Sequence, residues 1–226
     1  ENTFVLRISD YNTSGLSDPY TQSNDPFNFS FDGWNALIKI DGGANKGDDK
    51  AGAFGIGKSA PFSNSYYRLI FYRTYNQKYE RAAQGISRLM SYQNGALMTS
   101  GIGYYGEAEG NNPVEAIPEL DSINKRLKIG TDVFIYGFKS TSNWETEITV
   151  ALLENFLISF YYGQLRVKVQ GREINKKSLS RYVERIHRER PGATKGTYGN
   201  YLALTRKEGV HTYSKNFHGM GTLELS

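Results

Sequence analysis

The feature that most constrains the fold is a glycine-rich stretch at residues 51–62, AGAFGIGKSAPF. Gly52, Gly55 and Gly57 can adopt positive φ angles without a steric cost, so successive backbone N–H groups can turn toward one ligand. A helix that begins at Lys58 adds the positive end of its dipole, and the lysine adds a full charge. The stretch therefore predicts a phosphate-binding loop.

The sequence also matches the pattern of a second class of phosphate-binding loop, the P-loop, through Gly52, Gly57, Lys58 and Ser59. A P-loop leaves the end of a buried apolar strand. Residues 41–50, DGGANKGDDK, are too polar to form such a strand. We therefore favour a loop of another class over a P-loop enzyme, and a surface turn before a helix is the structural alternative.

Composition narrows the class of protein. With 38% hydrophobic and 14% aromatic residues, the 226-residue chain can bury a core. No run of about 18 apolar residues occurs, so no membrane partner is expected. The chain has no Cys and only three scattered His, so neither disulfides nor a metal site within the chain is predicted. These features favour a cytoplasmic protein.

The apolar pattern predicts strands with helices inserted between them. Strands are expected at 4–8, 66–74, 82–92, 131–138, 164–171, 201–206 and 222–226. Helices are expected at 32–40, at 58–62, from the capping-box pattern Ser142-x-x-Glu145 to Gly163, and at 178–190, with 93–128 irregular. Because strict βαβ alternation is absent, the predicted class is α+β. It is a two-layer sandwich with a mixed, mainly antiparallel sheet and helices on one face.

Three short motifs occur along the chain in a fixed order. They are Asp10-x-Asn12-x-x-Gly15-Leu16, Gly52-x-Phe54-Gly55-x-Gly57-Lys58-Ser59-Ala60, and Gly130-Thr131 at the entry to a strand. Together they resemble the nucleotide-binding motifs of the GHKL ATPases, the superfamily of gyrase B, the large heat-shock chaperone, histidine kinases, MutL and the MORC proteins. The resemblance covers roughly residues 4–170, and it is strongest to bacterial members associated with restriction and phage defence.

The resemblance implies a Bergerat-type fold that binds ATP with Mg²⁺. Asp10 would accept a hydrogen bond from the adenine amino group, Asn12 and Gly15 would form the turn beneath the base, and Thr131 would support Asp10 through a water or hydroxyl contact. Residues 17–51 would form a polar lid. The phosphate-binding residues would be Gly52, Phe54, Gly55, Ile56, Gly57, Lys58 and Ser59.

The chain departs from the family pattern in two places. Asn12 stands where glycine is usual, with one extra residue before Gly15. The family's general base and Mg²⁺-holding Asn lie upstream of the first motif, where this chain has only residues 1–3 before its first strand. The resemblance thus implies one ATP-binding domain over 1–226, truncated at its N-terminus, with the catalytic base upstream of residue 1 and 196–226 as the start of a following segment. Glu154-Asn155 imitates the missing pair, but it is interpreted as an ordinary polar helix face.

A nucleic-acid-binding module is the alternative function, in which the glycine-rich loop grips nucleic-acid phosphate and a basic C-terminal stretch adds contacts. Residues 166–195 carry ten Lys and Arg against three Glu, so this stretch could contact DNA phosphates. In the favoured interpretation, ATP binding and lid closure drive a conformational change or homodimerisation of a larger, DNA-associated defence protein. A purely structural module ranks below both, and a serine hydrolase is excluded because no Gly-x-Ser-x-Gly elbow occurs.

Overall fold

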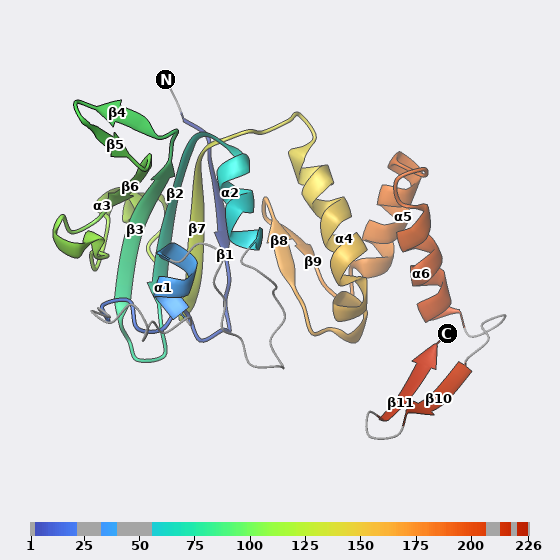
Figure 1. Cartoon of the computed structure of the whole chain (residues 1–226). Helices are drawn as coiled ribbons and strands as arrows, with labels where there is room; N and C mark the ends of the chain where they lie inside the picture. The colour runs from blue at the N-terminus through green and yellow to red at the C-terminus, as the bar shows by residue number, and fades with distance from the viewer. Residues whose placement is uncertain (1–2, 22–32, 40–55, 207–212, 218–220, 226) are drawn as a thin grey trace. The chain divides into compact units, whose positions relative to one another are not determined.

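The computed structural model describes residues 3–21, 33–39, 56–206, 213–217 and 221–225. The chain divides into two compact units, Glu1–Lys139 and Ser140–Ser226, which we call unit 1 and unit 2. Figure 1 labels their helices and strands. The prediction of a single domain over 1–226 stays a prediction.

Unit 1 is built on a five-stranded sheet with strand order β1-β7-β2-β3-β6 (Figure 1). The strands are β1 (Val5–Ser9), β7 (Gly130–Phe138), β2 (Ser65–Tyr75), β3 (Arg81–Arg88) and β6 (Ile102–Tyr105). Each neighbouring pair is antiparallel. The end of β1, the start of β7 and the end of β2 therefore lie at the same edge of the sheet.

Both faces of this sheet are covered, because successive residues of a strand point to opposite faces. Ile135 of β7 packs in a core cluster with Trp34 and Ile38 of α1 (Gly33–Ile38) and with Phe62 of α2 (Ala60–Ser63). Its neighbour Phe134 packs on the other face with Leu120 of α3 (Pro118–Ile123).

The smaller elements of unit 1 lie outside this sheet. They are the 3₁₀ helices η1 (Ile56–Ser59) and η2 (Glu109–Asn111) and the hairpin of β4 (Tyr92–Asn94) and β5 (Leu97–Thr99). The α+β class and the mainly antiparallel sheet are confirmed. The placement of the helices on one face holds for α1 and α2 but not for α3, and the finer Bergerat arrangement stays a prediction.

Unit 2 has a hydrophobic core that lies between its helices and a small β-hairpin. Its elements are α4 (Trp144–Tyr162), β8 (Val167–Val169), β9 (Arg172–Ile174), α5 (Leu179–Glu189), α6 (Lys195–Thr205), β10 (Tyr213–Phe217) and β11 (Gly221–Leu225). Leu153 and Phe160 of α4 pack with Val183 and Ile186 of α5. Helix α4 ends where Gly163 adopts a left-handed conformation, as the sequence predicts.

Several details of the predicted elements are wrong. Residues 201–205 form the end of helix α6 rather than a strand, because Tyr198, Tyr201 and Leu204 recur at helical spacing against the core of unit 2. The segment 93–128, predicted to be irregular, contains β5, β6 and α3. The Ser142–Glu145 capping box does not form, since α4 is capped at Asn143 with no side-chain cap bond.

Candidate functional site

The first and third motifs meet at one edge of the sheet. Because β1 and β7 are antiparallel, Ser9 pairs with Asp132. Asp10, which follows Ser9, therefore lies beside Thr131, which precedes Asp132. The Asp10 backbone N–H donates to the Thr131 carbonyl at 3.0 Å, and the Thr131 backbone N–H donates to the Asp10 carboxylate. Thr131 thus supports Asp10 through its main chain, whereas the resemblance implied a water or hydroxyl contact.

The Asp10 carboxylate keeps one oxygen accessible to a ligand. Oδ1 accepts from Thr131 and lies 3.5 Å from Nη2 of Arg126, whereas Oδ2 accepts only from the Thr13 hydroxyl, at 3.1 Å, among the described residues. The side chain is 47% exposed. Since each carboxylate oxygen has two lone pairs, Oδ2 can accept a further hydrogen bond from outside the protein.

The turn after Asp10 explains the departures in the first motif. Asn12 has φ = 62°, a left-handed conformation that Asn tolerates better than most residues, so it fills a place where glycine would also fit. Gly15 has φ = +69°, and a Cβ there would lie 2.6 Å from the Tyr75 carbonyl oxygen and 2.8 Å from Cα of Asn76. The turn therefore lies directly against the end of β2.

Two side chains at the end of β2 hold this turn, and the sequence analysis missed both. Thr74 Oγ1 accepts from the Leu16 N–H at 2.8 Å, and Asn76 Nδ2 donates to the Leu16 carbonyl at 3.1 Å. Both side chains are buried. In the sequence they stand in Arg-Thr-Tyr-Asn-Gln, which predicts only the end of a strand and a turn, so no local signal indicated the contact.

A pocket of about 400 Å³ opens beside the turn. Its lining residues are Ser14, Gly15, Leu16, Ser17, Gly33, Asn76, Gln77 and Lys78. The volume lies within the usual range for small-molecule sites, about 300 to 1,000 Å³. Lys78 donates to Asp18 at 2.6 Å, and this hydrogen bond lowers the pKa of Asp18 and raises the pKa of Lys78. Asp10 and Thr131 adjoin the turn but do not line the pocket.

Lys58 contacts helix α1, whose Gly33 lines the same pocket. It lies in η1, and its Nζ donates to the Ala36 carbonyl at 3.4 Å. Ala36 is about one helical turn beyond Gly33, which lines the pocket, and the Trp34 N–H donates to the Ser17 carbonyl at 3.0 Å. The cation of the second motif is therefore connected to the turn of the first motif through α1.

The rest of the second motif is only partly within the described residues. Gly57 and Ser59 lie in η1, which leads into α2 with Pro61 in its first turn, so the short helix predicted at 58–62 is confirmed. Ile56 begins η1. Gly52, Phe54 and Gly55 lie outside the described residues, as do segments 22–32 and 40–51 of the expected lid.

A chain of ion pairs runs beneath Asp10. Asp132 is 1% exposed and accepts from two arginines, with Oδ2 at 2.7 Å from Nη2 of Arg73 and Oδ1 at 2.6 Å from Nη1 of Arg126. Arg73 also donates to Asp121 at 2.6 Å. Arg126 continues to Asp10, donating to its backbone carbonyl. Neither arginine was a site candidate in the sequence.

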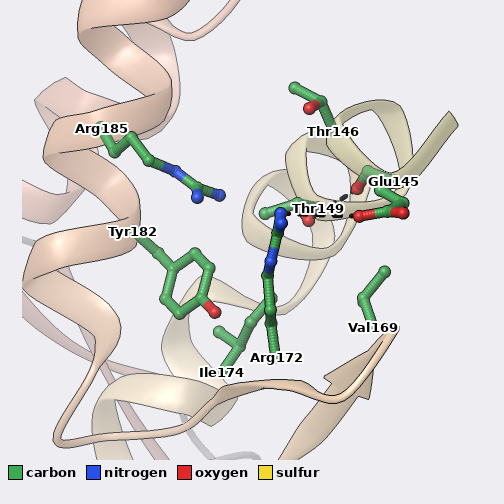
Figure 2. Close-up of a pocket in the computed structure, with 8 residues that line it drawn as sticks. All are labelled: Glu145, Thr146, Thr149, Val169, Arg172, Ile174, Tyr182 and Arg185. Carbon is green, nitrogen blue, oxygen red and sulfur yellow. Dashed lines mark hydrogen bonds and ion pairs between the residues drawn. The ribbon is translucent and has the colours of Figure 1, made fainter. Parts of the chain in front are cut away.

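Unit 2 holds the basic stretch and a small notch between α4, β9 and α5. The notch measures about 10 Å³, room for one water-sized group. Figure 2 shows the Arg185 side chain pointing into it from α5 and Arg172 extending from β9 toward α4. Arg172 lies 3.5 Å from the Glu145 carboxylate, and the Arg185 guanidinium lies 5.0 Å from the Tyr182 ring centroid.

The remaining expectations from the sequence concern the Glu154-Asn155 pair, a metal site and a membrane span. Glu154 and Asn155 are exposed on α4, where Asn155 donates to the Ala151 carbonyl, as expected for a polar helix face. Within the described segments, no group of three or more His, Asp or Glu side chains is placed to hold a metal ion. The helices described here lack the combination of length and apolar character that a membrane span requires.

Comparison with known proteins gives no relative: no family model, no curated protein and no solved structure matches the chain.

Proposed function

We propose that the chain is the ATP-binding domain of a GHKL-type ATPase with a Bergerat-type fold. The observation that carries the proposal is the junction of Asp10 and Thr131. These residues are 121 positions apart in sequence, yet the backbone N–H of each donates a hydrogen bond to the other residue. Asp10 donates to the Thr131 carbonyl, and Thr131 donates to the Asp10 carboxylate. The first and third motifs thus lie side by side, with the carboxylate half exposed at the end of the sheet, and this supports the proposal.

Two features support an adenine nucleotide. Asp10 Oδ2 has the acceptor capacity that an adenine amino group needs, and a pocket large enough for a small molecule lies beside the same turn, although Asp10 does not line it. Lys58 contacts α1, the helix whose Gly33 lines that pocket. Mg²⁺, ATP hydrolysis and dimerisation of a larger DNA-associated protein belong to the same proposal and rest on the resemblance.

Asp10→Asn is expected to weaken binding of a non-hydrolysable ATP analogue by about tenfold or more. An amide can present a donor to the adenine amino group, and a mismatched buried polar pair costs about 1–3 kcal/mol. Isothermal titration calorimetry on the full chain, with and without Mg²⁺, measures the effect. Asp121→Asn is the matched control, because that carboxylate contacts Arg73 and not Asp10. An Asp10→Asn affinity within twofold of wild type would sink the assignment.

The same variant is also expected to affect stability. A residue that only bound adenine could be replaced without loss of stability. Asp10 instead accepts from Thr131 and Thr13 and lies near Arg126, so its replacement should lower the thermal midpoint of the nucleotide-free protein slightly. Because the side chain is about half exposed, solvent screening keeps this loss small.

Contact with nucleic acid is a second candidate function, favoured by the shape of α5. Leu179, Tyr182, Val183 and Ile186 form its buried face, which leaves Arg181 and Arg188 exposed on the opposite side. Arg172 and Arg185 of the same unit line the notch in Figure 2 instead, where each lies near a glutamate, 3.5 Å from Glu145 and 3.9 Å from Glu189 respectively. This surface is distinct from the Asp10 region and can bind independently of it.

Arg181→Glu with Arg188→Glu is expected to weaken binding to duplex DNA and to flatten its salt dependence. Each lost phosphate contact removes about 0.9 from the slope of log K against log salt, so the pair should remove about 2. Fluorescence anisotropy across a salt series measures both quantities. Lys125→Glu with Lys128→Glu makes the same charge change at exposed positions of unit 1. Equal effects of the two double variants would reject a DNA surface on α5.

A further inference from the structure

Arg126 is a buried arginine that connects the hydrophobic interior of unit 1 with the exposed Asp10 carboxylate. Its side chain is 2% exposed and lies in the segment between α3 and β7. One terminal nitrogen, Nη1, donates to Asp132 at 2.6 Å. The other, Nη2, donates to the Asp10 carbonyl and lies 3.5 Å from Asp10 Oδ1. The two ends of one guanidinium therefore contact two different carboxyl-bearing residues.

The inner end of this connection is fixed by the sheet. Asp132 on β7 stands opposite Arg73 on β2, and Arg73 holds the second carboxylate oxygen through Nε at 3.0 Å and Nη2 at 2.7 Å. Arg73 is itself held at its remaining nitrogen by Asp121. Because a guanidinium is planar and its donors form a rigid fork, fixing Asp132 also fixes the direction in which Arg126 presents Nη2.

The outer end adds a third contact to a carboxylate that is otherwise held by the Thr131 N–H and the Thr13 hydroxyl. Arg126 and the Thr131 N–H both act on Oδ1 of Asp10, so Oδ2 is the oxygen with capacity left for a ligand. The Arg126 guanidinium also lies 5.0 Å from the ring centroid of Tyr11, which covers it on one side. A hydrogen-bond acceptor whose orientation is set in advance loses less entropy when a ligand binds.

Gly130 supplies the space that this contact needs. Its φ is +137°, and a Cβ at this position would lie 2.5 Å from the Asp10 carbonyl oxygen, 2.7 Å from Oδ1, and in contact with Nη2 of Arg126. A side chain at residue 130 would therefore separate Arg126 from Asp10. The glycine of the third motif is explained by the passage of the arginine, in addition to its backbone conformation.

We infer that Arg126 is a positioning residue for adenine recognition, which orients Asp10 Oδ2 toward the adenine amino group. The inference rests on the proposed function. Its consequence concerns selectivity: adenine has an amino group where guanine has a carbonyl oxygen, so a fixed acceptor favours ATP over GTP. Without Arg126, only the Thr131 N–H and the Thr13 hydroxyl hold the Asp10 carboxylate, so it can turn further from the guanine carbonyl and the preference for ATP decreases.

Three variants separate positioning from stability. Arg126→Met removes both contacts and keeps a long apolar side chain. Arg126→Lys keeps the charge beside Asp132 but has one terminal nitrogen, so it cannot serve Asp132 and Asp10 in the way that the guanidinium does. Gly95→Ala lowers stability in the turn of the β4–β5 hairpin, outside the ion-pair chain, because Gly95 has a positive φ of +62°. The full chain is used, with non-hydrolysable ATP and GTP analogues as probes.

Calorimetry gives the ratio of the two affinities, and thermal unfolding without nucleotide gives the midpoint. Both Arg126 variants should reduce the ATP-to-GTP affinity ratio by about tenfold, the effect of one charge-assisted contact. Gly95→Ala should lower the midpoint and leave the ratio within about twofold. Should Arg126→Met fail to fold, Arg126→Lys decides the question.

The outcomes distinguish the two proposals. A wild-type chain that binds neither analogue overturns the proposed function itself. If the wild type prefers ATP and Asp10→Asn abolishes the preference, but the Arg126 variants retain it, the proposed function stands and the positioning role is wrong. A ratio that falls in step with the midpoint across all three variants would show that Arg126 acts only through stability.

Discussion

Asp132→Asn is expected to lower the free energy of unfolding of unit 1 by about 3–5 kcal/mol, the usual cost of breaking a buried ion pair from one side. Asp132 is 1% exposed and forms ion pairs with two arginines whose side chains are 5% and 2% exposed. The amide keeps one acceptor oxygen but no charge. Arg73 would then depend on Asp121, and Arg126 on the half-exposed Asp10, for a negative partner.

Denaturant unfolding of the full chain, with hydrogen exchange of the β2 and β7 amides, assigns the loss to unit 1. Asp121→Asn is again the matched control, since Asp121 is 33% exposed and its pair with Arg73 should be worth no more than about 1 kcal/mol. The expected result is a clear gap between the two variants. A loss for Asp132→Asn no larger than for Asp121→Asn would mean that water or rearranged partners satisfy the buried arginines.

Much of the fold could be predicted because its elements are encoded locally. Runs of apolar and aromatic residues indicated β2 and β7, and the apolar spacing after Trp144 with Gly163 behind it indicated α4. The neighbourhood of Asp10 and Thr131 was also foreseen, but through a resemblance to an ATPase family. The physical reason for this neighbourhood is that the end of β1 lies beside the start of β7, and this follows only from the strand order.

The ion-pair chain could not be predicted, because it depends on strand register. Arg73, Asp132 and Arg126 stand in the local sequences Tyr-Arg-Thr, Thr-Asp-Val and Lys-Arg-Leu, each of which is compatible with an exposed polar position. A shift of one residue in the pairing of β2 with β7 would move Arg73 to the opposite face. The strand prediction at 201–206 was wrong for a different reason. A short apolar run such as Tyr-Leu-Ala-Leu is compatible with a strand or with a buried helix, and here it belongs to helix α6.

Gly15→Ala is expected to destabilise unit 1 by about 3 kcal/mol or more, through two separable costs. The left-handed conformation at φ = +69° costs a residue with a side chain about 1–2 kcal/mol. The added Cβ also meets backbone atoms, 2.6 Å from the Tyr75 carbonyl oxygen and 2.8 Å from Cα of Asn76, which cannot rotate away. The turn must move off β2, and the Leu16 hydrogen bonds to Thr74 and Asn76 are then lost.

Gly95→Ala isolates the conformational cost, because Gly95 has φ = +62° and no atom within 4 Å of its added Cβ. Only the first term applies there, so Gly95→Ala should cost about 1–2 kcal/mol and leave ATP-analogue affinity unchanged. Gly15→Ala should cost more, expose the Leu16 amide to rapid hydrogen exchange, and weaken the analogue, since the turn lines the pocket. Equal losses of stability in the two variants would mean that the turn yields without leaving β2. Retained protection at Leu16 together with full affinity would separate the pocket from the turn and place the nucleotide elsewhere on unit 1.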